Sequence, residues 1–338
     1  NHSLFRIPHL HTQAFPFLFP ADPPADVVYG KYTAYTENAD LRGKIAFVSA
    51  EEAGRRPYFE SANDWAKSAS ERGASGLIIE VASGSGDVPA INAVEPYVQR
   101  PLPIPSVIVG TSSRPILNLG LRNGDRAEIV IQGAAHEVAS ASNVIARLVR
   151  GPKWLVVTTP SSGWFTCAGE RGPGVALFLG LARYLAECEF EYSILFMANS
   201  GHEMGTLGAH GILDEVAPPP SEVLAWIHLG ASISTRRWEM GASGVEATSE
   251  PEPAGNLVAT ASLLPRVQKA FAGVSWLAPR SSGPVAGELE HFIDAGYEAF
   301  GFFGPHYYFH TTYDTPETTG PELLAPIGEG LRRFVDSL

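Results

Sequence analysis

The chain has 338 residues, of which 45% are hydrophobic and 18% are charged, and its formal net charge is −12 at pH 7. This length allows two domains, or one large one, each with a hydrophobic core. The negative charge disfavours nucleic acids and anionic membranes as partners, because both require basic patches. No apolar stretch approaches the ~18 residues that a membrane span needs. Two cysteines, Cys167 and Cys188, are too few for a disulfide framework.

Residues 27–135 have the pattern of a small mixed α+β unit. Apolar runs rich in β-branched residues predict strands at 43–50 and 74–82, and apolar residues at helical spacing lie between these runs. Two further runs, 105–110 and 127–132, also have strand character. We expect these last two strands to pair or to lie side by side.

From about residue 140, strand and helix patterns alternate. The expected strands are 141–149, 153–159, 192–198, 222–230 and 297–304, and the expected helices are 172–187, 256–273 and 320–338. The runs 192–198 and 222–230 are continuously apolar, as in the buried strands of parallel sheets. Alternation of this kind predicts an α/β sheet with crossover connections, in which ligands bind at the carboxyl ends of the strands.

Six ionisable residues lie at or beyond the expected strand ends: Glu170, His202, Glu203, His228, Glu288 and His310. Carboxylates and imidazoles that converge on one sheet edge are suited to acid–base catalysis or metal binding. Taken singly, each has the simpler interpretation of a hydrogen-bonded surface or core residue. Thr206 stands where a His-Glu-x-x-His zinc motif would have its second histidine, and neither a Gly-x-Ser-x-Gly elbow nor a Gly-x-Gly-x-x-Gly loop occurs.

The order of several segments is also informative. The segments "DLRGKIAFVS", "ASERGASGLIIE" and "PIPSVIVG" are similar to a protease-associated domain. The segments "CAGERGPGVALFLGLARYL", "SGHEMGTLGAHG" and "FHTTYDTPE" resemble the core of zinc-dependent exopeptidases, the family of secreted aminopeptidases, glutamate carboxypeptidase and glutaminyl cyclase. The resemblance implies an α/β fold with a phosphorylase/hydrolase-like mixed sheet flanked by helices, formed by residues 1–26 and 136–338. It further implies a protease-associated α+β domain inserted at 27–135.

The resemblance implies a degenerate metal site. In two-metal members, one ion takes a first-strand histidine, a bridging aspartate and a third-strand aspartate, and here Pro160 and Gly230 stand where the histidine and the second aspartate would be. The other ion takes the bridging acid, a second glutamate and a final histidine, which correspond to Glu170, Glu203 and His310. Three protein ligands plus water form an open catalytic zinc site. The resemblance therefore implies at most one zinc ion.

His202 stands at the position of the family's general base, where a glutamate is usual. Imidazole titrates near pH 6.5, so His202 can still give or take a proton, with Glu203 beside it in the sequence. Glu288 matches a further acid near the substrate. His228 and Trp226 are two residues apart on one strand and therefore share a face, so we expect them on the substrate side with Glu170. The simpler interpretation of His228 is a core histidine.

The leading interpretation is an aminopeptidase-like enzyme that acts on an amide or a related small carbonyl compound, with at most one metal ion and with His202 as the acid–base group. One alternative is a catalytically silent binding protein. Another is a metal-free hydrolase, cyclase or lyase that uses His202, His310 and the glutamates directly. The expected partner is a small-molecule or peptide substrate. Arg171 and the pair Arg236 and Arg237 could bind an anionic group of a substrate, but solvated surface charges are their default interpretation.

Overall fold

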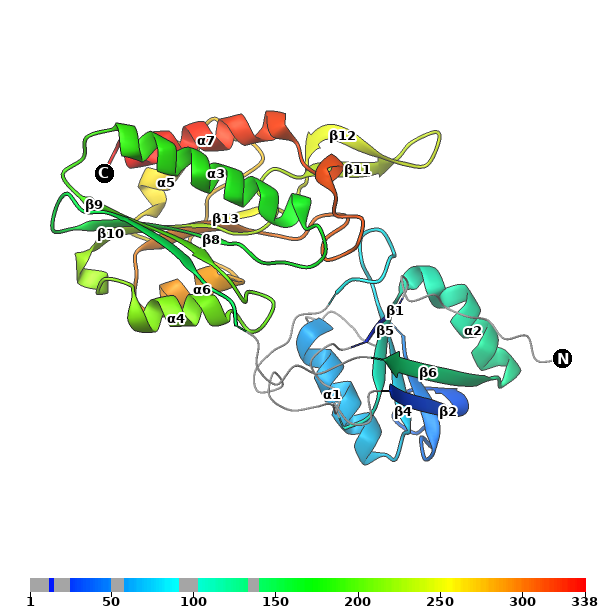
Figure 1. Cartoon of the computed structure of the whole chain (residues 1–338). Coiled ribbons are helices and arrows are strands. Elements are labelled where there is room, and N and C mark those ends of the chain that lie inside the picture. The colour runs from blue at the N-terminus through cyan, green and yellow to red at the C-terminus, as the bar shows by residue number, and fades with distance from the viewer. Residues whose placement is uncertain (1–11, 15–24, 50–57, 91–102, 133–139) are drawn as a thin grey trace. The chain divides into compact units, whose positions relative to one another are not determined.

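A computed structural model describes residues 12–14, 25–49, 58–90, 103–132 and 140–338. The chain divides into two compact units, Asn1–Ala139 and Ser140–Leu338, called here the N-terminal and C-terminal units. Each unit contains a sheet with helices on both faces (Figure 1). None of the helices within the described ranges combines the length and the hydropathy that a bilayer-spanning segment needs.

The N-terminal unit is built on a six-stranded sheet with the order β1-β5-β4-β3-β2-β6. Its strands are β1 (Thr12–Ala14), β2 (Ala25–Ala34), β3 (Lys44–Val48), β4 (Gly76–Val81), β5 (Ser106–Gly110) and β6 (Arg126–Gln132). The four central strands are parallel, and β1 and β6 are antiparallel edge strands. Helix α1 (Tyr58–Glu71) packs on one face through Ala66 and Ala69, and α2 (Arg114–Asn123) packs on the other through Leu117.

Two expectations for this unit need correction. The strands at 105–110 and 127–132 do not pair, because β5 lies between β1 and β4 whereas β6 pairs with β2. The element missing from the expectation was β2, which pairs with both β3 and β6 and so separates β6 from the other strands. In addition, Thr12–Ala14, which the expected division placed with the C-terminal core, pair with β5 in this sheet.

The C-terminal unit contains a second six-stranded sheet with the order β13-β14-β10-β8-β9-β7. Its strands are β7 (Val144–Leu148), β8 (Trp154–Pro160), β9 (Ser193–Asn199), β10 (Val223–Leu229), β13 (Asn256–Ala259) and β14 (Ala299–Phe303). The four inner strands are parallel, and β7 and β13 are antiparallel edges. The mixed α/β fold expected from the alternating patterns is therefore present. A separate two-stranded ribbon consists of β11 (Arg236–Met240) and β12 (Val245–Pro251).

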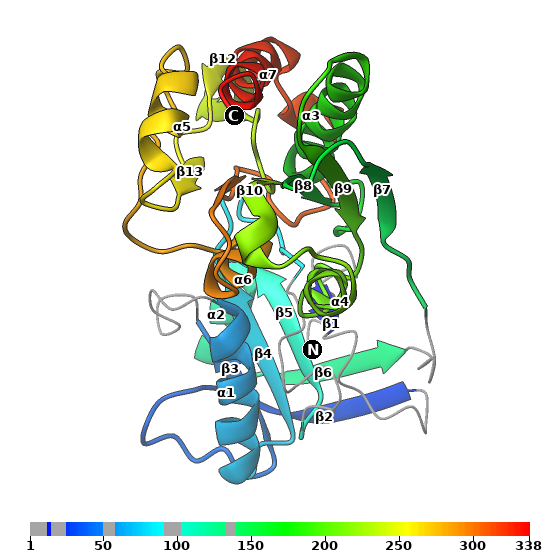
Figure 2. The same ribbon diagram turned by 90° about the vertical axis from the view of Figure 1, so that its left-hand side faces the viewer.

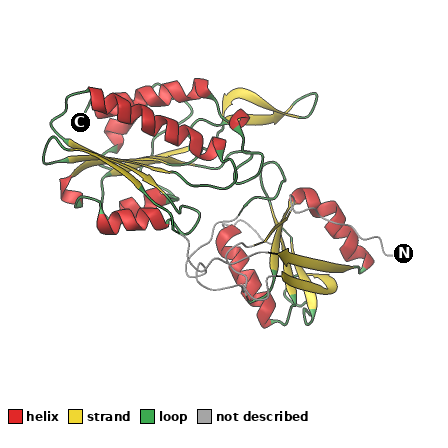
Figure 3. Cartoon of the chain, in the orientation of Figure 1, coloured by secondary structure: helices red, strands yellow, loops and turns green. Residues whose placement is uncertain are grey.

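Helices cover both faces of this second sheet (Figures 2 and 3). One face carries α3 (Ala168–Glu187), α5 (Leu264–Ala270) and α7 (Pro321–Val335), and the other carries α4 (Leu207–Glu215) and α6 (Glu288–Asp294). The expected helix at 256–273 is wrong in its first part, because residues 256–259 form the edge strand β13. Pro265 stands in the first turn of the shorter helix α5 that follows.

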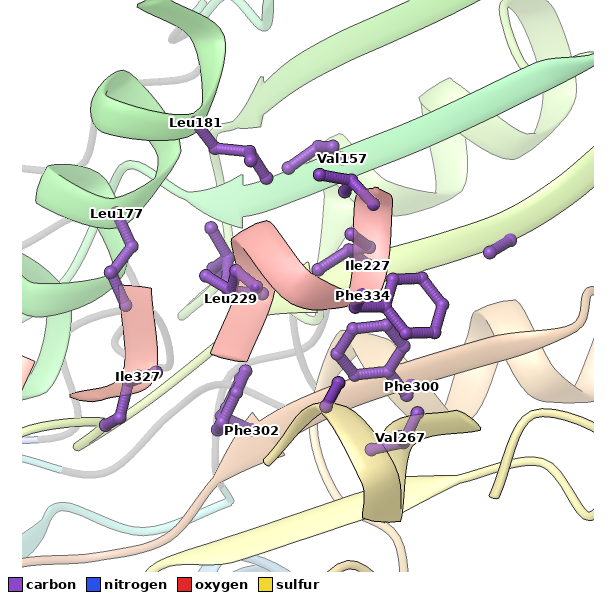
Figure 4. Packing of buried hydrophobic residues seen from close by; sticks show 14 of the residues in the cluster. Val157, Leu177, Leu181, Ile227, Leu229, Val267, Phe300, Phe302, Ile327 and Phe334 are labelled. Carbon is purple, nitrogen blue, oxygen red and sulfur yellow. The ribbon is translucent and has the colours of Figure 1, made fainter. Parts of the chain in front are cut away.

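The core beneath α3, α5 and α7 is formed by alternate residues of the parallel strands. Ile227 and Leu229 of β10 point to the same side as Phe300 of β14 (Figure 4). Phe334 of α7 packs against Phe300, with the two ring centres 4.5 Å apart. Residues of the intervening register, such as Trp226, face α4 and α6 instead. This packing on both faces keeps the four parallel strands in place and so determines where their carboxyl ends lie.

Candidate active site

The candidate site lies at the carboxyl ends of the parallel strands of the C-terminal unit. Glu170 is in the first turn of α3, which follows β8, and His202 and Glu203 are in the turn after β9. Glu288 is the first residue of α6, and His310 follows β14. Ligand sites of α/β sheets lie at this edge, because the connecting loops there can bring side chains from several strands together.

Four of the charged or polar side chains form a buried cluster around Arg171, called here the Arg171 cluster: Glu170, Arg171, Glu203 and His310. The Nη2 atom of Arg171 lies 2.8 Å from Oε1 of Glu170 and 2.8 Å from Oε1 of Glu203. His310 Nε2 lies 3.2 Å from the same Oε1 atom of Glu170 and 4.0 Å from Oε2 of Glu203. All four residues are buried. The sequence interpretation of Arg171 as a solvated surface charge is therefore wrong.

Electrostatics within the cluster favour the charged forms. Burial alone would raise the pKa of Glu170, but the charges of Arg171 and His310 outweigh burial and hold this pKa at about 2. Burial alone would lower the pKa of His310, yet the carboxylate of Glu170 raises it above its ordinary value. Glu170 is thus ionised at neutral pH.

Asp314 positions two parts of the cluster, a role that the sequence analysis missed. Its carboxylate accepts hydrogen bonds from the backbone N–H groups of Gly169 (2.6 Å) and Glu170 (3.1 Å), and from the hydroxyl of Thr318 (2.8 Å). A carboxylate at the amino end of a helix satisfies N–H groups that have no partner within the helix. Because Asp314 follows His310 by four residues, it ties the His310 segment to the first turn of α3.

A second pair, His202 and Glu288, lies at the same sheet edge. His202 Nδ1 lies 2.9 Å from Oε1 of Glu288, whose other oxygen accepts a hydrogen bond of 2.6 Å from Asn199 Nδ2. Burial alone would raise the pKa of Glu288, but its hydrogen bond with His202 and the nearby imidazoles hold it at about 2. Because an ionised carboxylate can only accept, the proton of this contact is on Nδ1 of His202. The His202 side chain is 13% exposed while that of Glu288 is fully buried, so water can reach only the imidazole.

His228 and Trp226 both contact Thr158, beneath the strand ends. Thr158 Oγ1 accepts a hydrogen bond of 2.9 Å from Trp226 Nε1 and lies 3.0 Å from His228 Nδ1. Both rings are buried, and Trp226 stacks on Phe292 with the ring centres 4.2 Å apart. Burial lowers the pKa of His228 to about 4, so this imidazole is neutral at neutral pH. The geometry places both residues in the core layer under the site.

Gly230, where the resemblance implies an aspartate ligand, has no room for a side chain in this backbone. A Cβ atom added to Gly230 would lie 2.2 Å from the carbonyl oxygen of Phe302, which is far inside van der Waals contact. It would also lie 3.2 Å from Nε2 of His228. Pro160, where the resemblance implies a histidine ligand, likewise offers no side-chain ligand atom.

The remaining ligand set is suited to a single ion by the type of its donor atoms. Glu170, Glu203 and His310 each offer one ligand atom, and these atoms lie within 4.8 Å of one another. Oε2 of Glu170 and Oε2 of Glu203 are buried and have no hydrogen-bond partner among the described residues. Two carboxylates and one imidazole are ordinary zinc ligands. The three residues form a candidate metal-binding triad, with Arg171 in contact with one oxygen of each glutamate.

Solved structures with the same fold come from bacterial peptidases. The zinc aminopeptidase BSAP from Bacillus subtilis aligns with a TM-score of 0.71 over 97% of this chain and 78% of its own, at 18% identity. The Peptidase M28 precursor from Shewanella amazonensis aligns with a TM-score of 0.72 over 98% and 78%, and the aminopeptidase from Aneurinibacillus sp. strain AM-1 with 0.59 over 96% and 76%, both at 18% identity. No curated protein sequence is significantly similar to the chain.

These similarities establish the fold, and a direct sequence match establishes the family. The sequence model of Peptidase family M28 matches residues 156–335, which is more than half of the chain. This range contains the Arg171 cluster and the pair of His202 and Glu288. The expected relation to zinc-dependent exopeptidases is thereby confirmed, and the chain belongs to Peptidase family M28.

Proposed function

We propose that this chain is a peptidase-like enzyme that acts on an amide or a related small carbonyl compound, with His202 as its acid–base group. The observation that carries the proposal is the 2.9 Å contact between His202 Nδ1 and Glu288, a buried carboxylate that remains ionised. An imidazole paired in this way resembles the orienting half of a catalytic triad, in which the carboxylate holds one tautomer and stabilises the imidazolium. The substrate is a peptide or a small amide.

Glu288 determines which ring nitrogen of His202 carries the proton. When Nδ1–H of His202 donates a hydrogen bond to Glu288, the Nε2 atom of the neutral imidazole keeps its lone pair and can take a proton from a water molecule or from a substrate group. Asn199 holds the second oxygen of Glu288, and the backbone N–H of His202 donates to Ser162 Oγ at 3.1 Å. These contacts fix both partners, which keeps the proton-transfer geometry constant through the reaction.

The proposal includes at most one metal ion, which Glu170, Glu203 and His310 would hold, and it is supported by the spacing of their ligand atoms within 4.8 Å of one another. When bound, such an ion supplies a Lewis acid that polarises a carbonyl oxygen. In this proposal residues 27–135 are a protease-associated domain, and residues 136–338 form the catalytic core.

A metal-free hydrolase, cyclase or lyase is the second candidate, and one specific observation favours it. The guanidinium of Arg171 already balances charge on Glu170 and Glu203. A buried guanidinium can donate hydrogen bonds to a developing oxyanion as well as to carboxylates. In this version His202, His310 and the glutamates act on the substrate directly.

The test is turnover of a panel of aminoacyl anilides, N-acyl amino acids and N-terminal glutaminyl peptides by the wild type and by His202→Ala. A positioned acid–base group contributes about 10²–10⁴-fold to the rate, so kcat should fall by that factor with little change in melting temperature. His210→Ala is the matched control, because His210 is an exposed imidazole in the neighbouring helix α4 and should leave kcat unchanged. Equal turnover of His202→Ala and wild type would reject the role, and no turnover of any class by the wild type would favour the silent binding protein.

A further inference from the structure

Arg171 is held at both ends of its guanidinium group. Its Nη2 atom contacts Oε1 of Glu170 and Oε1 of Glu203 at 2.8 Å each, and its Nε–H donates to the carbonyl oxygen of Ser162 at 3.0 Å. The side chain is only 5% exposed. We propose that this guanidinium is a built-in cation that takes the place of a metal ion between Glu170 and Glu203, so that the site keeps its two carboxylates together without zinc.

The first argument is charge balance. Two ionised carboxylates that share a buried position repel each other, and a buried charge is stable only when it is paired and hydrogen-bonded. In the two-metal peptidases that this chain resembles, a metal ion supplies the positive charge that pairs with the carboxylates. Here Arg171 provides it, through a guanidinium that does not lose its proton in proteins.

The second argument is position. One nitrogen atom lies at hydrogen-bonding distance from both carboxylates, so the positive charge lies between the same two side chains that would bind an ion. Zinc takes carboxylate oxygens at about 2.0–2.2 Å, so an ion between Glu170 and Glu203 would lie within the space of the guanidinium or against it. The hydrogen bond from Arg171 Nε–H to the Ser162 carbonyl oxygen also holds the side chain in place. Moving the guanidinium away from the carboxylates would therefore break this hydrogen bond as well.

The third argument concerns the unused oxygens. Oε2 of Glu170 and Oε2 of Glu203 are buried and have no hydrogen-bond partner among the described residues, which shows that the carboxylates have capacity for a stronger cation. Removal of Arg171 leaves both carboxylates without their main counter-charge. A zinc ion should then bind the triad of Glu170, Glu203 and His310 far more tightly than it binds the wild type.

The experiment is a zinc titration of the whole chain in competition with a chromogenic chelator. Arg171→Ala should bind one zinc ion on the order of 100-fold more tightly than the wild type, the factor expected when two charge-assisted hydrogen bonds no longer compete. Arg183→Ala is the control, because Arg183 is on the same helix and its side chain is 84% exposed. It should bind zinc as the wild type does. A folded Arg171→Ala protein with unchanged zinc affinity would overturn the proposal.

The wild type alone gives a second, independent readout. Its melting temperature should be the same after EDTA treatment and in the presence of excess zinc, because ligand binding to the folded state would raise it. Tight one-to-one zinc binding by the wild type, with a matching rise in melting temperature, would contradict the proposal even if Arg171→Ala does not fold. The inference concerns the same site as the proposed function, but its test measures bound zinc, whereas the test of the proposed function measures turnover. The two proposals can therefore fail independently of each other.

Discussion

The buried imidazole of His228 should make the C-terminal unit sensitive to mild acid. Burial lowers the pKa of His228 from an ordinary value of 6.5 to about 4. Between these two values the unfolded chain binds a proton that the folded chain does not bind, so stability falls as the pH falls through this window. Above pH 6.5 both states are neutral at this residue, and its contribution to the pH dependence vanishes.

The size of the effect follows from the two pKa values. Near pH 5 almost every unfolded chain has a charged His228 whereas about one folded chain in ten does, which lowers the free energy of unfolding by about 2 kcal/mol relative to pH 7.5. The perturbation that isolates this term is His228→Gln, because an amide can keep a hydrogen bond with Thr158 but does not titrate. The variant should lose about 2 kcal/mol less than the wild type between the two pH values.

The assay is urea unfolding near pH 7.5 and near pH 5, followed by tryptophan fluorescence. Five of the six tryptophans lie within residues 140–338, so the signal reports mainly on the C-terminal unit. Wild type and His228→Gln share all their other titratable groups, so the difference between their losses isolates His228. If wild type and His228→Gln lose the same free energy on acidification, the reasoning about the buried neutral imidazole is refuted.

Three further predictions concern the site and the core. Glu288→Gln should reduce kcat by about 10²–10⁴-fold, as His202→Ala should. In steady-state kinetics the double variant should be no slower than either single variant, and additive losses would show that the two residues act independently. Gly230→Asp should bind no more zinc than the wild type by elemental analysis, and it should be destabilised by about 1–3 kcal/mol in urea, because its Cβ would lie 2.2 Å from the Phe302 carbonyl oxygen. Any zinc bound beyond the wild-type level would disprove this. Phe334→Ala should lower the free energy of unfolding by about 3–5 kcal/mol, and a loss below 1 kcal/mol would mean that Phe334 is not part of a tightly packed core.

Much of the C-terminal fold was predictable because its central strands have a strong local signal. The apolar runs at 192–198 and 222–230 correspond to β9 and β10. Both strands are buried on both faces, so their sequences are continuously apolar and are easy to recognise. Edge strands were harder to predict. Residues 256–259 were expected to be helical, because the spacing of apolar residues across 256–273 is compatible with a helix and only pairing with β14 selects the strand.

The candidate site was predictable in its members but not in their contacts. His202 and Glu288 were both expected at the strand ends, yet 86 residues separate them, and no local pattern indicates their hydrogen bond. Arg171 was misinterpreted because an arginine in a short glycine-rich segment is usually solvated, and its burial depends on Glu203, which is distant in the sequence. Asp314 was missed because the partners that tie it to α3 are backbone N–H groups, which have no residue-specific signal.

The link through Asp314 has a practical consequence for protein engineering. Because its carboxylate binds the N–H groups of Gly169 and Glu170, the loop that delivers His310 and the first turn of α3 share one anchor. Gly169 has no room for a side chain, since a Cβ atom would lie 2.4 Å from Thr318 Oγ1. A chimaera that exchanges either segment alone with a homologue would break this anchor. Segments 167–171 and 306–318 should therefore be transplanted together, as one discontinuous cassette.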